Sequence, residues 1–307
     1  MGTSFVYRDR RRSWPRRLRV VGIVAALVAV PAAAGAEPAA ASRTPSGPAR
    51  EGTRETPFGR SLRVESTELD SRLEGRIHSV IDHPFSRAQA LADPAHWCEL
   101  LPLLPNIRHC EAASDGRRVT LRFARRFDQP LADTHTVSFD VRVSAMRRDR
   151  LEVALQAPQG PFGTSDYRLQ VAVAPVDHDR VSLQVQYGYA YGSRARLLGQ
   201  AYLTTRGRDK VGFTVVGTAE DGGPEYIGGL RGAVERNAMR LYLAIDAYLD
   251  ALDEAGERRR ERSLRAWLDA IARHPRQLAE ADPVAYFEAS GGDFDHAGHG
   301  GEIAGRS

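Results

Sequence analysis

Three tyrosines continue the apolar face of one predicted strand. The odd-numbered residues of the segment VSLQVQYGYAYG are Val181, Leu183, Val185, Tyr187, Tyr189 and Tyr191. Successive side chains of a strand point to opposite faces of the sheet, so these six side chains share one face. A buried phenol hydroxyl needs a hydrogen-bond partner. Three in a row therefore favour the wall or mouth of a ligand cavity, with an ordinary wet sheet end as the alternative.

Further candidates for ligand contact come from other parts of the chain. Asn237 lies one turn before Leu241 on the apolar stripe of a predicted helix, where its amide could anchor a ligand or cap the helix start. Ordinary core packing is the alternative for the rest. The remaining candidates are Trp97, Phe162, Tyr167, Leu241 and Ile245.

Acid–base catalysis has weaker support in the sequence. A general base must lie within hydrogen-bond reach of its substrate, and no nucleophile elbow, zinc-protease pair, phosphate loop or dinucleotide fingerprint is present. We therefore predict no catalytic residue, no metal and no cofactor, and we favour a solvated tail over a metal site for Asp293, Asp295, His296 and His299. The acid and base candidates are Asp82, His83, His96, His109, Asp133 and His135.

The basic character of the chain lies in its first residues. The 307-residue chain has a net charge of +4. Residues 1–36 hold seven arginines and one aspartate, so the remainder has 36 basic against 38 acidic residues. This distribution argues against a nucleic-acid partner, because such a partner needs a basic surface on the domain itself.

Residues 1–36 have the layout of a secretory signal peptide cleaved before Glu37. An arginine-rich start precedes an apolar run over residues 20–30 and the small residues Ala34, Gly35 and Ala36. We expect an exported, periplasmic protein; the alternative is an inner-membrane anchor formed by an uncleaved leader. Residues 37–60 and 291–307 are predicted to be a disordered linker and a disordered tail, because both lack periodicity.

Cys98 and Cys110 lie twelve positions apart. In an exported protein an isolated pair of cysteines is more often a disulfide than a catalytic or metal site. We predict a disulfide, which would contribute roughly 2–3 kcal/mol by restricting the unfolded chain.

The elements that would position these residues form an α+β domain over residues 61–254. A first strand ends near His83-Pro84, because proline disfavours helix in the residue before it, and two short helices follow, the second beginning near Asp93-Pro94. Alternating segments then predict an antiparallel meander with one covered face. They span residues 118–127, 135–146, 150–157, 166–176 and 181–192.

A long amphipathic helix over residues 233–252 is expected to cover the inner face of this sheet. Its apolar residues recur at spacings of three and four, and Arg236 and Arg240 fall on the opposite side, which we expect to be exposed. A helix near residue 200 and a hairpin turning at Asp221-Gly222-Gly223 lie before it. The pattern of residues 255–290 predicts further short amphipathic helices. They would form a helical extension that could contact an envelope protein.

The opening GRIHSVIDHPFSRAQALADPAHWCELLPLLPNIRHCEA resembles the START-like (SRPBCC) superfamily, which includes the Bet v 1 and polyketide cyclase groups. In that superfamily a first strand ends in a polar step before proline, here Asp82-His83-Pro84, and an aromatic residue follows in the second small helix, here Trp97. The order of elements matches over residues 70–253.

This resemblance implies a helix-grip fold, in which a curved antiparallel sheet grips a long C-terminal helix. It also implies a hydrophobic ligand, lipid-like or sterol-like, between the sheet and that helix. The alternatives are an enzyme of the aromatase or cyclase type on the same scaffold and a non-catalytic envelope interaction protein.

Overall fold

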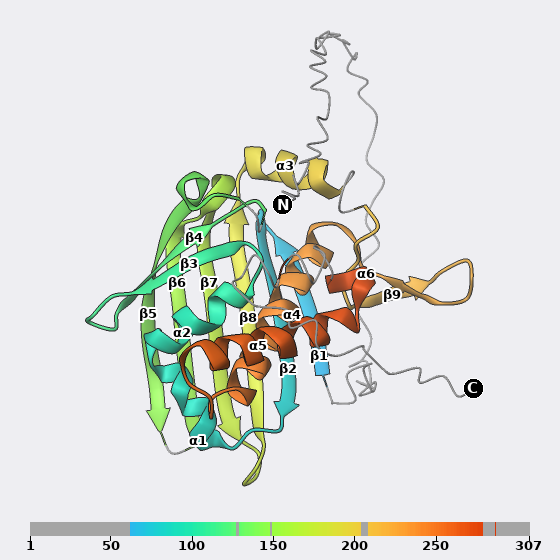
Figure 1. Ribbon diagram of the computed structural model, residues 1–307. Coiled ribbons are helices and arrows are strands. Elements are labelled where there is room, and N and C mark those ends of the chain that lie inside the picture. Colours follow the sequence, from blue (N-terminus) through green and yellow to red (C-terminus); the bar gives the residue numbers. More distant parts are fainter. Residues whose placement is uncertain (1–61, 127–128, 148, 204–207, 279–285, 287–307) are drawn as a thin grey trace, which may run out of the picture. The chain divides into compact units, whose positions relative to one another are not determined.

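The computed structural model describes residues 62–126, 129–147, 149–203, 208–278 and 286 (Figure 1). The predicted leader at 1–36, the linker at 37–60 and the tail at 291–307 lie outside the described residues. None of the helices within the described residues is long and apolar enough to cross a membrane.

One eight-stranded antiparallel sheet forms the centre of the domain (Figure 1). The strands follow one another across it in the order β1-β2-β8-β7-β6-β5-β4-β3, so a hairpin from the start of the domain pairs with the last strand of a six-stranded meander. The strands are β1 (Leu62–Leu69), β2 (Arg72–Ile81), β3 (Ile107–Ala112), β4 (Arg118–Phe123), β5 (His135–Arg147), β6 (Arg150–Gln159), β7 (Thr164–Pro175) and β8 (Val181–Tyr191).

The predicted meander is confirmed, and the sequence analysis missed the two edge strands. β1 buries only Leu62 and Ser66, and β3 buries only Ile107, so neither shows the alternation that reveals an inner strand. The turn between β1 and β2 has positive φ at Asp70 and Ser71, as a two-residue type I′ hairpin requires.

Short helices connect β2 to β3 and cover one end of the sheet. Asp93 caps α2 by accepting a hydrogen bond from the backbone N–H of Ala95 at 2.9 Å, and Pro94 occupies the first helical position. This confirms the predicted start of the second helix. The connecting helices are α1 (Phe85–Ala88), η1 (Gln89–Ala92), α2 (Pro94–Leu100) and η2 (Leu101–Leu103).

Helix α4 (Gly229–Asp250) lies across the inner face of the sheet, in front of β2 and β8 (Figure 1). It approaches β2 closely at Gly75, where a Cβ atom would lie 2.9 Å from the carbonyl oxygen of Val234. Glycine at this position therefore lets the helix backbone rest directly on the strand. Fifteen residues of α4 are buried, more than one apolar stripe can account for.

The expectation that Arg236 and Arg240 face solvent was wrong. They are 1% and 5% exposed, and α5 (Gly256–Ala272) and α6 (Pro275–Leu278) pack against α4 at Arg240. Trp267 donates its indole N–H to the carbonyl of Arg240 at 3.1 Å, and Arg240 donates to the carbonyl of Leu278 at 2.9 Å. The helical extension thus contributes to the main core.

The segment between β8 and α4 contains the predicted helix and hairpin. They are α3 (Ser193–Leu203), β9 (Val215–Thr218) and β10 (Pro224–Tyr226). Two further short helices, η3 (Leu131–Asp133) and η4 (Pro161–Gly163), precede β5 and β7.

A buried carboxylate fastens the start of this hairpin to α4. Glu235 is fully buried and accepts hydrogen bonds from the Ser66 hydroxyl at 2.6 Å and the Thr214 hydroxyl at 2.7 Å. The backbone N–H groups of Phe213 and Thr214 donate to its other oxygen at 2.7 and 3.0 Å. One side chain therefore joins β1, α4 and the segment before β9.

Candidate functional site

A cavity of about 170 Å³ lies between the sheet and α4. Six strands, β3 to β8, contribute to its wall, and α4 closes the opposite side. The sheet residues that make the wall apolar are Ile107, Leu121, Phe123, Phe139, Leu155 and Leu169. These residues occupy alternate positions on successive strands, so their side chains share the inner face of the sheet. The alternation that buries this face therefore also forms the cavity wall.

The segment between η2 and β3 forms the rim of the cavity. Leu104, Pro105 and Asn106 line it, and Asn106 is exposed, so the cavity reaches the surface there. The disulfide between Cys98 and Cys110 closes this segment, with Cα atoms 4.9 Å apart, and confirms the predicted pairing. The disulfide therefore restrains the part of the chain that borders the cavity opening.

Six of the residues that line the cavity carry polar groups. They are Asn106, Tyr167, Arg168, Tyr187, Asn237 and Arg240. Arg240 Nη1 donates to Asn237 Oδ1 at 3.3 Å, and the rings of Tyr167 and Tyr187 lie edge to face with 6.2 Å between their centroids. The described lining residues include no carboxylate and no imidazole.

Burial keeps the phenols of this site neutral. Desolvation raises the pKa of Tyr187 well above its ordinary value of 10 and also raises the pKa values of Tyr167 and Tyr189. At neutral pH these tyrosines therefore act as hydrogen-bonding groups and carry no charge.

Of the predicted ligand contacts, Tyr167, Tyr187, Asn237 and Leu241 line the cavity. Tyr189 lies behind the wall, with its ring stacked on that of Tyr167 at 5.3 Å. The sequence signal for Tyr187 was its place in the alternating strand, and the signal for Asn237 was its place on the helix stripe.

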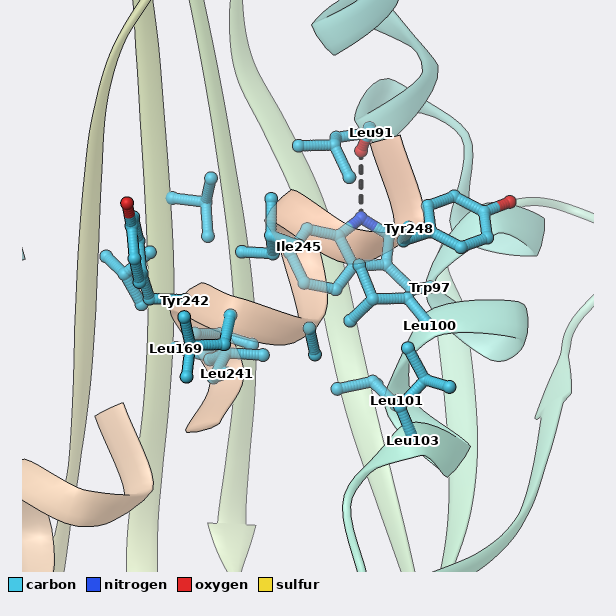
Figure 2. Packing of buried hydrophobic residues seen from close by; sticks show 14 of the residues in the cluster. Leu91, Trp97, Leu100, Leu101, Leu103, Leu169, Leu241, Tyr242, Ile245 and Tyr248 are labelled. Carbon is cyan, nitrogen blue, oxygen red and sulfur yellow. Dashed lines mark hydrogen bonds between the residues drawn. The ribbon is translucent and has the colours of Figure 1, made fainter. Parts of the chain in front are cut away.

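The other predicted contacts lie away from the cavity lining. Trp97 is fully buried and donates its indole N–H to the carbonyl of Leu91 at 2.8 Å, and Ile245 packs beside it in the core (Figure 2). The Tyr191 hydroxyl bonds to Glu68 in a separate small cluster. Phe162 is half-buried, and its ring lies 4.6 Å from that of His135.

Along the chain, a strand hairpin is followed by short helices, an antiparallel meander and one long helix that lies over a cavity. This is the START-like helix-grip fold. The sequence matches no protein-family model and no curated protein.

Solved structures with similar backbones include three named proteins. Norcoclaurine synthase from Thalictrum flavum, a point mutant in complex with a transition-state analogue, is 15% identical with a TM-score of 0.32 over 48% of this chain and 90% of its own. A START superfamily protein from Mycobacterium smegmatis is 15% identical, TM-score 0.29, over 44% and 92%. The Zhui aromatase/cyclase from Streptomyces sp. R1128 is 12% identical, TM-score 0.32, over 66% and 94%. Such values assign neither a ligand nor an activity to this chain.

The histidines considered for catalysis do not line the helix-grip cavity. His83 Nε2 lies 3.0 Å from a carboxylate oxygen of Asp246 and ties the end of β2 to α4. His96 Nδ1 lies 2.6 Å from the Tyr248 hydroxyl. His109 and His135 are exposed on β3 and β5.

A more open hollow of about 350 Å³ lies beside β1 and β2. Its lining is polar, and its charged groups have protein partners. Arg231 donates to the carbonyl of Ser66 at 2.7 Å, and Glu74 pairs with Arg76 and accepts from Gln186 at 2.9 Å. We therefore regard the smaller helix-grip cavity as the functional site.

Tyr167, Tyr187 and Tyr189, whose rings pack against one another, predict a loss of stability at high pH. Because the folded-state pKa values of Tyr167, Tyr187 and Tyr189 lie above the unfolded value, their contribution is fully present below about pH 10. Above that pH the unfolded chain loses protons first, so the free energy of unfolding falls by up to about 1.4 kcal/mol per pH unit for each tyrosine. Urea unfolding between pH 8 and 11 measures this slope, and Tyr187→Phe should make it shallower. An equal slope in that variant would contradict the assignment.

Proposed function

We propose that the protein binds or carries a hydrophobic small molecule in the cavity between the sheet and α4. The observation that carries this proposal is a mostly apolar cavity with a few polar groups, walled by six strands and closed by one helix. Small-molecule sites in proteins have this composition: mostly apolar walls with a few convergent polar groups.

The cavity size limits what can enter without a change of conformation. Its volume of about 170 Å³ is close to the roughly 150 Å³ of an engineered cavity that binds benzene. Typical small-molecule pockets measure roughly 300–1,000 Å³. A lipid-like or sterol-like molecule would therefore place only a ring or a short part of a chain here, unless the rim at residues 104–106 moves outward.

Binding is favoured over catalysis by the chemistry of the lining. A cyclase-type enzyme needs a group that accepts a proton near neutral pH. The polar groups of the described lining residues are phenols with raised pKa values, two amides and two guanidinium groups, which donate or accept hydrogen bonds without taking up a proton near neutral pH.

We also propose that the protein works after export, in the periplasm. The disulfide between Cys98 and Cys110 supports this, since disulfides persist in oxidising compartments and are rare in the cytosol of most organisms. A partner protein at the C-terminal helices would meet the charged outer face of α5, because its apolar residues Leu264, Trp267 and Leu268 are buried.

Filling the cavity tests the proposed function. Leu241→Phe adds volume at the cavity wall, so we expect it to weaken the binding of toluene, a one-ring probe, at least tenfold. Because the added ring enters empty space, the free energy of unfolding should change by less than about 1.5 kcal/mol. Isothermal titration calorimetry and urea unfolding measure the two effects.

Leu249→Phe is the matched control on the same helix. Leu249 is fully buried in the packed core and does not line the cavity. Overpacking there should cost about 1–3 kcal/mol of stability and leave toluene binding intact. Failure of the wild-type protein to bind toluene, or equal binding by the Leu241→Phe protein, would contradict the proposal.

A further inference from the structure

The described residues contain three exposed leucines, and all three lie at one end of the sheet. Leu69, Leu131 and Leu197 are 71%, 48% and 67% exposed. Leu69 ends β1, Leu131 lies in η3 before β5, and Leu197 lies in α3 after β8. Each antiparallel strand ends beside the start of its neighbour, so β1, β4, β6 and β8 all end on this side of the sheet.

Contacts join the segments that carry these leucines. The backbone N–H of Tyr191, at the end of β8, donates to the carbonyl of Ser71 in the turn after β1 at 2.9 Å. Helix η4, which precedes β7, packs against α3. The ring of its Phe162 lies 5.0 Å from the guanidinium carbon of Arg125 in the loop before η3. The turn between β1 and β2 thus shares one surface with η3, η4 and α3, which we call the leucine surface.

One face of α3 carries Leu197 and lies in solvent, beyond the end of β8 (Figure 1). The exposed residues of α3 whose side chains are described follow the spacing of a single helix face: Ser193, Arg196, Leu197, Gln200 and Ala201. The other face rests on the domain, since a Cβ atom at Gly199 would lie 3.1 Å from the Leu230 side chain. Residues 193–208 contain four arginines and no acidic residue. The exposed face therefore offers an apolar side chain beside a positive charge.

The helix-grip cavity reaches the same end of the sheet. Ile107 starts β3 and Phe123 ends β4; the two residues pair with each other, and both line the cavity. The rim at residues 104–106 leads directly into β3. A hydrophobic molecule that passes this rim therefore enters or leaves at the end of the sheet where the leucines are exposed.

The composition of the leucine surface fits a lipid bilayer better than a protein partner. Leucine is under-represented among the residues that dominate the binding energy of protein interfaces, where tryptophan, tyrosine and arginine are enriched. The three leucines also lie on separate segments, and none of them lines the helix-grip cavity or the hollow beside β1 and β2. A bilayer needs no matching groove, because leucine side chains enter its apolar layer while arginine meets the lipid phosphates.

We propose that the leucine surface docks on a phospholipid bilayer, with Leu69 and Leu197 inserted among the lipids and Arg196 against a phosphate. Docking is weak and reversible, because a few leucine side chains bury less apolar surface than one acyl chain. A bilayer held at this end of the sheet gives a hydrophobic ligand a path between lipid and the cavity rim that avoids bulk water. Only this path rests on the proposed function; the docking itself goes beyond it.

Vesicle sedimentation with the mature protein tests the proposal. Vesicles of phosphatidylcholine and phosphatidylglycerol in equal parts, at about 1 mM lipid, should carry down a measurable fraction of the wild-type protein. A variant with Leu69→Ser and Leu197→Ser should bind these vesicles at least about tenfold more weakly, because two apolar side chains no longer enter the bilayer. Arg196→Gln should weaken binding about fivefold, the effect of one positive charge near an anionic lipid surface.

Val176→Ser is the matched control for the leucine replacements. Val176 is 50% exposed in the turn between β7 and β8, at the opposite end of the sheet. Its replacement should leave vesicle binding unchanged. Because Leu69 and Leu197 do not line the cavity, the double leucine variant should bind toluene as tightly as the wild-type protein. Either single leucine replacement serves if the double variant does not fold.

Absence of the wild-type protein from the vesicle pellet, or equal sedimentation of the double leucine variant, would overturn the docking and leave the proposed function in place. A dimer in light scattering that the double leucine variant lacks would assign the leucine surface to a second copy of the chain and also overturn the docking. Vesicle binding that depends on the leucines, in a wild-type protein that does not bind toluene, would support the docking and overturn the proposed function.

Discussion

Replacing Glu235 with alanine is expected to lower the free energy of unfolding by roughly 3–4 kcal/mol. The buried carboxylate accepts four hydrogen bonds, from the hydroxyls of Ser66 and Thr214 and from the backbone N–H groups of Phe213 and Thr214. Hydrogen bonds to charged groups contribute about 1.5–3 kcal/mol each, and donors left buried without an acceptor add a further cost. Urea unfolding of the variant against the wild-type protein measures the loss.

Glu225→Ala is the matched control, because Glu225 is an exposed glutamate on the hairpin that begins just after the same segment. We expect its effect to stay within about 0.5 kcal/mol, as for most surface substitutions. Glu235→Gln should recover part of the loss, since an amide oxygen still accepts while its NH₂ group cannot. A loss below about 1 kcal/mol in Glu235→Ala would show that this carboxylate does not hold β1, α4 and the segment before β9 together.

Removing the disulfide is expected to affect both stability and binding. A variant with Cys98→Ser and Cys110→Ser should lose about 2–3 kcal/mol, because the bond closes a short loop in the unfolded chain. The same loop carries five residues that line the cavity, at positions 101 and 104–107. Its greater freedom should weaken toluene binding several-fold, since the rim must be ordered again when a ligand binds. Urea unfolding and calorimetric titration measure the two effects.

His109→Ser is the control for this pair, because His109 is exposed and lies next to Cys110 in the same strand. It should leave stability within about 0.5 kcal/mol and leave toluene binding unchanged. If the double serine variant loses stability but binds toluene as tightly as the wild-type protein, the disulfide restrains the fold without restraining the cavity.

The sequence was enough to predict the central architecture. Strict alternation in β8 placed Tyr187 on the inner face, and spacings of three and four placed Asn237 and Leu241 on the sheet side of α4. These patterns are informative because burial on one face imposes a period of 2 on a strand and 3.6 on a helix.

The missed features depend on contacts between distant segments. Arg236 and Arg240 were expected on a solvated helix face, yet both are buried, and nothing local in α4 indicates that α5 will pack against Arg240. The sequence analysis did not single out Glu235, because its partners Ser66 and Thr214 lie 169 and 21 positions away along the chain. The alternation in β8 also could not show that Tyr191 belongs to a different cluster, because the strand extends beyond the cavity.

Native mass spectrometry of the mature protein purified from its own cells tests the central claim most directly. The account predicts a stoichiometric excess mass that organic extraction releases as a hydrophobic molecule, and it predicts that the Leu241→Phe protein lacks this mass. A protein that carries no such molecule and does not bind toluene would contradict it.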